Sequence, residues 1–388
     1  MLKHTSCFCF AIGLALFLAT WGPAYAGPQA PKISPPSQPA SGPGGAEYSH
    51  QKVLKSKYGS GDTEYWLYEP ADPEPGSAPV VIFLHGWSAV NPQAYGAWIE
   101  HLVRRGNIVI FPRYQESVRT PVQNFTGNTL AALAAAFKEL QAGKHVRPQT
   151  DKVAVVGHSM GGELSSSVAA LAGSRGLPVP RAVMSVEPGK TWTRSKRIAF
   201  PLEDLSKVDP STLLLAVAGE EDHLAKDVDA KRIYKETTAI PPANKNYIVF
   251  LSDSHGKPAL KASHHAPVAI DPAYDSGEKR SGGRTGQKEG ARGGKLRERL
   301  KERLKEKLIE QAGDEVLNED GTLDPESVMG LSVNALDYYG YWKLLDGLCD
   351  AAFYGKNREY ALGNTPQQRY MGKWSDGVPV KELKIMNP

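Results

Sequence analysis

The chain has 388 residues, 41% of them hydrophobic and 23% charged, which is ordinary for a folded globular protein and excludes a chain too polar to build a core. The net charge of +4 indicates no special partner, and nucleic-acid binding is not expected because the positive charge alternates with glutamate and is concentrated in one segment. Only three cysteines occur, and Cys7 and Cys9 lie near the start, which excludes a disulfide-stapled scaffold.

Residues 1–26 have the pattern of a signal peptide. Lys3 precedes a nearly unbroken apolar run at 7–20, and Ala24-Tyr25-Ala26 supplies small residues for cleavage after residue 26. The run is about fourteen residues long, short for a membrane span, so an uncleaved anchor is the less favoured alternative. We therefore expect a secreted or periplasmic protein that keeps only Cys349 after cleavage.

A linker and one folded domain are expected to follow. Residues 27–46 are rich in proline, glycine and serine and are predicted to be disordered. From residue 47 to residue 388 we expect a single domain. It begins with a hairpin, in which strands 53–58 and 64–68 are joined by a glycine-rich turn.

The rest of the domain alternates strands with helices. The run Val80–Leu84 is continuously apolar, which is typical of a strand buried on both faces. Further strands are predicted at 107–111, 152–156, 182–186, 212–218 and 247–251, and helices at 93–105, 129–141, 160–172 and 228–237. This alternation predicts an α/β fold with a mostly parallel, doubly wound sheet and helices on both faces.

A charged insertion, residues 276–310, interrupts this pattern. Its first part is glycine, serine and charge, which predicts disorder. Within 296–308, leucine recurs every four residues among arginine, lysine and glutamate, which predicts a solvated helix with one narrow apolar stripe. Weak contact of this helix with a membrane surface or a protein is the alternative. Residues 322–354 are then expected to return to the core as helix, ahead of a C-terminal tail.

The segment Gly157-His158-Ser159-Met160-Gly161 matches the G-x-S-x-G nucleophile elbow. A serine at a tight turn between a strand and a helix projects its hydroxyl away from the sheet, and glycines are needed where strand and helix approach closely. The predicted strand 152–156 runs into this motif and the predicted helix leaves it. Ser159 is therefore the candidate nucleophile.

A serine hydroxyl needs a general base, and that base needs a carboxylate to orient it. Asp222 follows the predicted strand 212–218 within four residues and is the preferred acid; Glu220, Glu221 and Glu187 are the alternatives. His255 follows the strand 247–251 within four residues and is the preferred base. His264, in the sequence Ala-Ser-His-His-Ala-Pro, is the rival.

An oxyanion formed during such a reaction needs hydrogen-bond donors. We expect the backbone N–H groups of Met160, after the nucleophile, and of Trp87, in the loop after strand 80–84. His85 and His158 are then expected to be structural. Aromatic side chains on these loops, either packed or lining an acyl site, are Trp87, Tyr95, Trp98 and Trp192.

The stretches "FLHGW", "VVGHSMGGELS" and "AGEEDHL", in this order, resemble the α/β-hydrolase superfamily. They are most similar to its dienelactone-hydrolase and bacterial cutinase or polyester-hydrolase branches, and the resemblance covers residues 50–270. The cutinase-like ending "ASH…P" has two counterparts here, "DSHGKP" and "ASHHAP", which leaves the histidine open. The resemblance implies an α/β-hydrolase fold without a cap domain between residues 187 and 210.

The expected activity is hydrolysis of a small-molecule or polymeric carboxylic ester through an acyl-enzyme. No metal or organic cofactor is expected, because the sequence holds no H-E-x-x-H, C-x-x-C or G-x-G-x-x-G motif. Two alternatives stay open: an exported serine peptidase or amidase of the same fold, and a non-catalytic binding protein that keeps the fold.

Overall fold

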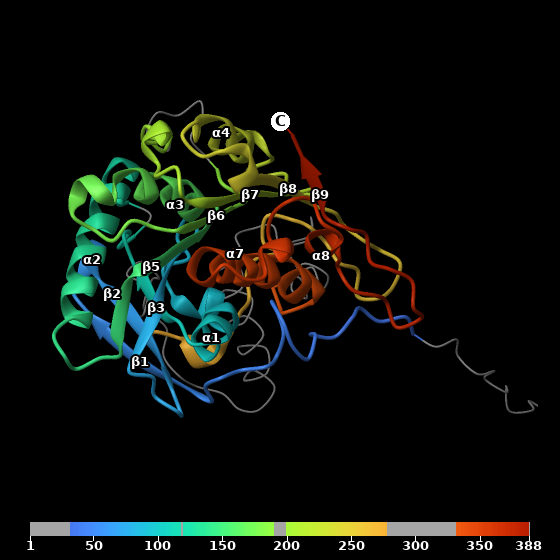
Figure 1. Cartoon of the computed structure of the whole chain (residues 1–388), viewed down its shortest axis with the longest axis horizontal. Helices are drawn as coiled ribbons and strands as arrows, with labels where there is room; N and C mark the ends of the chain where they lie inside the picture. The colour runs from blue at the N-terminus through green and yellow to red at the C-terminus, as the bar shows by residue number, and fades with distance from the viewer. Residues whose placement is uncertain (1–31, 118, 190–198, 278–330, 388) are drawn as a thin grey trace, which may run out of the picture. The chain divides into compact units, whose positions relative to one another are not determined.

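The structure is a computed structural model of the chain and describes residues 32–117, 119–189, 199–277 and 331–387 (Figure 1). Every element below belongs to one compact unit, Ile33–Pro388, which is called the second unit because residues 1–32 are divided from it. The predicted signal peptide, nearly all of the charged insertion with its leucine-striped helix, and Trp192 lie outside the described residues. Within the described residues, no helix combines the length and the apolar character that crossing a bilayer requires.

A nine-stranded sheet forms the centre of the second unit, in the order β1-β2-β4-β3-β5-β6-β7-β8-β9. The strands from β4 to β8 along this order are parallel, while β1, β2 and β9 run antiparallel to their neighbours. Their bounds are Lys52–Tyr58, Tyr65–Ala71, Ser77–Leu84, Ile108–Pro112, Arg147–His158, Ala182–Val186, Leu213–Gly219, Lys245–Phe250 and Lys384–Met386, from β1 to β9. The chain leaves β3 toward β4 and crosses back to β5, which places a topological switch point between β3 and β5.

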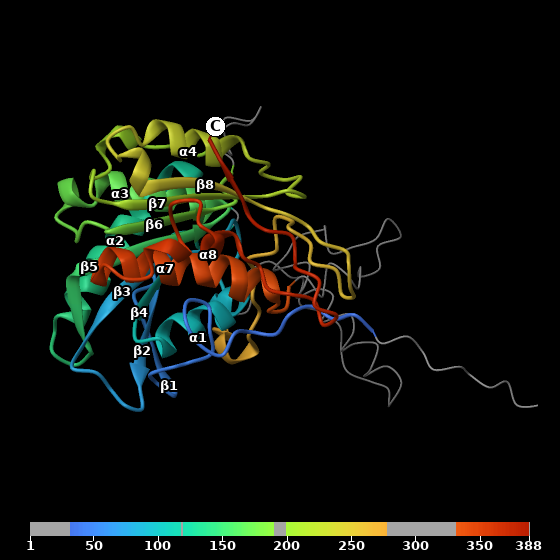
Figure 2. The same ribbon diagram turned by 45° about the vertical axis from the view of Figure 1, so that its right-hand side comes forward.

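Helices cover both faces of this sheet (Figure 2). Their bounds are Gly96–Arg104 for α1, Phe125–Leu140 for α2, Met160–Leu171 for α3, Val228–Glu236 for α4, Trp342–Tyr354 for α7 and Pro366–Arg369 for α8. Val81 and Phe83 of β3 pack in one core cluster with α1 and α7, whereas Val80 and Ile82 pack in another with α2 and α3. Because alternate residues of a strand face opposite sides, the unbroken apolar run follows from burial on both faces. The expected α/β-hydrolase fold class is confirmed.

The N-terminal hairpin, the inner strands β3 to β8 and the helices α1 to α4 lie where the sequence predicts them, within a few residues at most ends. The largest difference is in β5, which was expected at 152–156 and spans Arg147–His158. The predicted helical return appears as a π-helical turn, Asp337–Tyr341, that continues into α7. One strand was missed. The three-residue β9 pairs with β8 at the edge of the sheet, and a segment this short carries little periodic pattern.

The prediction of a disordered linker at 27–46 is wrong for its described part. The Gly44 N–H donates to the buried Asp346 carboxylate at 2.7 Å, and Asp346 also binds His101 and Arg105. A Cβ on Gly44 would lie 1.9 Å from the Tyr338 carbonyl oxygen. The segment is therefore held by its backbone at a place where only glycine fits, and a composition poor in apolar side chains does not reveal such contacts.

Candidate active site

Ser159 occupies a strained turn between β5 and α3. Its backbone angles are φ 56° and ψ −119°, and its N–H donates to the Val186 carbonyl at 2.9 Å. A Cβ on Gly157 would lie 2.0 Å from the Gly161 carbonyl oxygen, and one on Gly161 would lie 2.1 Å from the Leu84 carbonyl oxygen. Both glycines of the motif are thus required by close backbone approach, and the turn holds the serine in a conformation that L residues rarely adopt.

A continuous hydrogen-bonded chain connects Ser159 to a carboxylate through His264. His264 Nε2 lies 2.9 Å from Ser159 Oγ, and His264 Nδ1 lies 2.8 Å from Asp222 Oδ2. Because Asp222 accepts, the proton belongs on Nδ1, which leaves Nε2 free to accept from the serine hydroxyl. The imidazole and carboxylate are almost fully buried, with side chains 7% and 0% exposed, so water competes little for these bonds.

The prediction that His255 contacts Ser159 is wrong. His255 Nε2 instead lies 2.7 Å from Asp376 Oδ2, in the C-terminal tail. After β8 the chain makes a short excursion that closes on itself, because Asp253 and Leu260 exchange two backbone hydrogen bonds of 2.8 Å. His255 lies within this excursion, and His264 follows after the chain has returned to the sheet. The rival histidine therefore occupies the position next to the serine.

Asp222 lies where the sequence predicts the acid. Its Oδ1 accepts the backbone N–H groups of Leu224 at 2.9 Å and Ala225 at 2.8 Å, which fixes the carboxylate and leaves Oδ2 for His264. Burial would raise the pKa of Asp222, but the hydrogen bonds from His264 and the backbone outweigh burial and lower it. Asp222 is thus held as a carboxylate. The alternative Glu220 instead accepts from the Ser252 N–H at 3.1 Å.

Glu187, another alternative acid, lies beside the histidine without reaching it. It directly follows β6 with a φ of 47°, and its Oε2 is 4.0 Å from His264 Nδ1, compared with 2.8 Å for Asp222. Its Oε1 accepts the Tyr341 hydroxyl at 2.8 Å. Complete burial and the nearby Asp222 charge raise the pKa of Glu187 well above its usual value. Asp222 is therefore the carboxylate that orients His264.

His158 connects the histidine loop to the loop after β3. Its Nε2 lies 2.7 Å from the His264 carbonyl oxygen, and its Nδ1 lies 2.8 Å from the Tyr95 hydroxyl, which accepts the Gly86 N–H at 3.0 Å. Burial and the neighbouring His264 lower the pKa of His158 well below its usual value, so the ring stays neutral. Its position beside the elbow agrees with the sequence analysis, but the link to His264 was missed.

The loop after β3 passes close to the serine. A Cβ on Gly86 would lie 3.4 Å from Ser159 Cβ, and the Ser88 N–H donates to the Gln115 side chain at 2.9 Å. Between these positions, no partner among the described residues accepts from the Trp87 N–H. Met160 begins α3, and the first N–H groups of a helix have no partner within it. This arrangement is compatible with the expected oxyanion donors, which stay a prediction.

His85 packs under this loop, as expected. Its Nδ1 lies 2.6 Å from the Gly86 carbonyl oxygen and its Nε2 lies 2.7 Å from the Arg113 carbonyl oxygen, and the ring stacks on Tyr114. Burial lowers the pKa of His85 to about 4, against the smaller opposing effect of the two carbonyls. The neutral ring carries one N–H and so donates to one of these two carbonyl groups, and together with its stacking on Tyr114 this makes His85 a support for the loop.

The aromatic residues proposed for an acyl site divide between core and loop. Tyr95 and Trp98 are buried in the core at 1% and 0% exposure, while Trp87 is half-buried beside Phe125.

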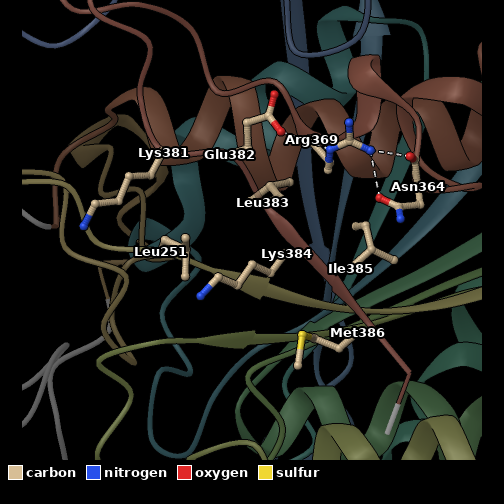
Figure 3. A pocket seen from close by; sticks show the side chains of 9 residues that line it. All are labelled: Leu251, Asn364, Arg369, Lys381, Glu382, Leu383, Lys384, Ile385 and Met386. Carbon is tan, nitrogen blue, oxygen red and sulfur yellow. Dashed lines mark hydrogen bonds and ion pairs between the residues drawn. The ribbon is translucent and has the colours of Figure 1, made fainter.

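A cavity of about 550 Å³ lies along β9 and not at Ser159. Figure 3 shows its lining residues, which are Leu251, Asn364, Arg369, Lys381, Glu382, Leu383, Lys384, Ile385 and Met386. A second cavity, of about 460 Å³, reaches Asp222 from the side of α4. Neither identifies an acyl-binding site.

Comparisons with known proteins give one partial family match and one distant structural match. Residues 56–203 match the Chlorophyllase family model. No curated protein matches the sequence. A solved structure from a study of two esterases of the fungus Rhizomucor miehei is 17% identical, covers 58% of this chain and 79% of its own, and has a TM-score of 0.45. The family match includes Ser159 and the loop after β3 but ends before Asp222 and His264, so those two are placed by geometry alone.

Proposed function

Because the chain is a member of the α/β-hydrolase superfamily, we propose that it hydrolyses carboxylic esters through an acyl-enzyme, with Ser159 as nucleophile. His264 is the general base in this proposal and Asp222 is the carboxylate that orients it. The observation that carries the proposal is the buried hydrogen-bonded chain from Asp222 through His264 to Ser159 Oγ, at the end of a strained strand–helix turn. The match to the Chlorophyllase family model supports the same chemistry.

The geometry supports a two-step reaction. Ser159 Oγ attacks the ester carbonyl carbon while its proton passes to His264 Nε2, and the backbone N–H groups of Trp87 and Met160 receive the negative oxygen. The C–O bond to the alcohol then breaks, and the departing oxygen takes the proton from His264. A water molecule repeats the attack on the acyl-enzyme with the same base, which releases the carboxylic acid and restores Ser159.

Asp222 contributes by holding the imidazole in one tautomer and by stabilising the imidazolium that forms in each step. Its own orientation is fixed by the amides of Leu224 and Ala225, which lie in the turn between β7 and α4. The substrate in this proposal is a small-molecule or polymeric ester. Nothing in the reaction requires a cofactor beyond these side chains and water.

Hydrolysis of p-nitrophenyl esters, with peptide anilides in parallel, tests the proposal. Ester turnover is expected, with stoichiometric labelling of Ser159 by a fluorophosphonate, and Ser159→Ala should abolish both. Turnover of the anilides alone would assign the site to a peptidase or amidase. Absence of turnover and of labelling in a folded protein would instead favour a non-catalytic binding protein.

We also propose export to the periplasm or the medium, on the basis of residues 1–26. N-terminal sequencing of active protein recovered from the cell envelope or medium should place the first residue near Gly27. Active protein that retains Met1 and is confined to the cytoplasm would contradict this proposal.

A further inference from the structure

One series of hydrogen bonds joins the backbone of the general base to the backbone of the loop after β3. The His264 carbonyl oxygen lies 2.7 Å from His158 Nε2. On the other side of the ring, His158 Nδ1 lies 2.8 Å from the Tyr95 hydroxyl, which accepts the Gly86 N–H at 3.0 Å. His158 is the last residue of β5 and directly precedes Ser159. The series therefore touches the segments of the base, the nucleophile and the loop expected to hold the oxyanion.

The protons of this series have only one possible order when the His158 ring is neutral. A carbonyl oxygen can only accept, so His158 Nε2 carries the ring proton and donates to the His264 carbonyl. His158 Nδ1 then accepts the single proton of the Tyr95 hydroxyl, whose oxygen accepts from Gly86. Burial and the neighbouring His264 hold the pKa of His158 well below its usual value, which keeps the ring neutral. Each of the three donors thus meets one acceptor.

The series lies in the protein interior. Tyr95 is 1% exposed, His158 3% and His264 6%, so water competes little for these hydrogen bonds. Glu187 Oε2 also lies near His158 Nε2, but at 3.8 Å, compared with 2.7 Å for the His264 carbonyl oxygen. The His158 ring therefore holds the backbone of His264 and not an acidic side chain.

Both ends of the series lie where small displacements matter for the proposed reaction. The carbonyl held by His158 belongs to His264, whose ring lies 2.9 Å from Ser159 Oγ. At the other end, Gly86 directly precedes Trp87, whose N–H is the expected oxyanion donor. A misplacement of about 1 Å in such groups can lower a rate by about 100-fold. A histidine that only filled the core would not need partners on both of these segments.

We propose that Tyr95 and His158 are positioning residues that fix the general base and the oxyanion loop relative to each other. This inference rests on the proposed function and deepens it, because it names side chains that hold the same site in its reactive geometry. Tyr95 and His158 act through the backbone of His264 and of Gly86, and neither exchanges a proton with the substrate. Their loss lowers kcat, which depends on alignment of the reacting groups, and leaves KM nearly unchanged.

The substitution Tyr95→Phe removes one oxygen from the series and keeps the aromatic ring in the core. For a p-nitrophenyl ester, kcat should fall by about 10- to 100-fold while KM stays within about twofold of the wild-type value. Tyr274→Phe is the matched control, because Tyr274 is also buried but its hydroxyl donates to the Glu100 side chain on α1. It should leave kcat unchanged. A wild-type kcat in Tyr95→Phe, or equal losses in the two variants, would overturn the proposal.

Two substitutions at His158 separate the ends of the series. Glutamine extends its amide about as far as Nε2 and can still donate to the His264 carbonyl, whereas asparagine reaches only about as far as Nδ1. His158→Gln should therefore retain more of the wild-type kcat than His158→Asn. Adding Tyr95→Phe to His158→Asn should cost little more, because residues that act as a unit are not additive. Full additivity of the two losses would contradict a single series.

Heteronuclear NMR of full-length protein labelled in its histidine rings tests the proton order without relying on turnover. His158 and His264 are assigned by the signals that disappear when each alone is replaced by glutamine. His158 should carry its proton on Nε2 at neutral pH, and Tyr95→Phe should shift the His264 ring signals, whereas Tyr274→Phe should not. A His158 proton on Nδ1, or His264 signals unmoved by Tyr95→Phe, would overturn the proposal. The expected shifts in a protein without ester turnover would support the series and refute the proposed function.

Discussion

The molecule contains two histidine–aspartate pairs that look alike and have different surroundings. His264 and Asp222 are 2.8 Å apart with side chains 7% and 0% exposed, whereas His255 and Asp376 are 2.7 Å apart and 35% and 33% exposed. The buried pair has a third partner, Ser159 Oγ, while the surface pair connects the excursion after β8 to the C-terminal tail. Contact distance therefore does not distinguish a candidate catalytic pair from a surface pair.

The two pairs differ in their exposure to solvent and in the further groups to which they are hydrogen-bonded. Water screens the charges of a pair that is one-third exposed and competes for its hydrogen bonds, so such pairs contribute little to stability. In the dry interior the same contact fixes the tautomer of His264 and is reinforced by the amides that hold Asp222. The Ser159 hydroxyl adds the group to be activated, which the surface pair lacks among the described residues.

The largest expected effect comes from replacing each of the two histidines in turn by alanine. His264→Ala should lower kcat for an ester by about 10⁴-fold or more, and combining it with Ser159→Ala should add little, because such residues act as a unit. His255→Ala should leave kcat close to that of the wild type. Thermal unfolding of each variant controls for loss of fold. An active His264→Ala beside an inactive His255→Ala would reverse the assignment.

Replacing the aspartate of each pair tests the same comparison and is expected to have a somewhat smaller effect on kcat. Asp222→Asn keeps the shape of the side chain but favours the wrong tautomer of His264, so kcat should fall by about 10³- to 10⁴-fold. Asp376→Asn, the matched change in the surface pair, should leave kcat unchanged. Steady-state kinetics with one p-nitrophenyl ester measures both, and equal losses in the two variants would refute the distinction between the pairs.

A smaller effect is expected where the loop after β3 approaches the serine. A Cβ on Gly86 would lie 3.2 Å from the Tyr95 hydroxyl and 3.4 Å from Ser159 Cβ, whereas one on Gly76 would meet nothing within 4 Å. Gly86→Ala should therefore displace the loop relative to Ser159 and lower kcat by about 10- to 100-fold, and Gly76→Ala should not lower kcat. Comparable rates for the two variants would show that the loop does not position the reacting groups.

The smallest effect concerns stability and a buried carboxyl outside the two pairs. Burial, with a further contribution from Asp229 that Arg232 opposes, raises the pKa of Glu163 well above its usual value. The unfolded chain then loses this proton at lower pH than the folded protein, so stability falls as pH rises above about 4.5, by about 1.4 kcal/mol per unit of pKa shift. Glu163→Gln should flatten this decline and unfold at a higher temperature than wild type at pH 8. An unchanged pH dependence of Tm would contradict this prediction.

Much of the fold could be predicted because its signals are local. The apolar run of β3 and the small residues of α3 reflect burial that depends mainly on each segment itself. The elbow at Ser159 was recognisable because its motif is short and contiguous and Gly157 is required by a contact within it, although Gly161 is required by the Leu84 carbonyl of β3.

The choice between the two histidines depends on contacts distant in the sequence. The excursion that carries His255 away is held by Asp253, whose carboxylate accepts the Trp374 indole N–H at 3.2 Å and the Lys381 N–H at 2.9 Å. Both partners lie in a tail that the sequence analysis left without a role. Proximity to the end of β8 therefore favoured His255, although tertiary contacts place His264 at the serine.

Intact-mass measurement of fluorophosphonate labelling tests the central claim, that His264 and not His255 activates Ser159, most directly. The wild type and His255→Ala should each gain one adduct, localised to Ser159 by peptide mapping, at similar rates. His264→Ala should remain unlabelled over the same time while staying folded. Labelling of His264→Ala at the wild-type rate, or loss of labelling in His255→Ala alone, would contradict the account.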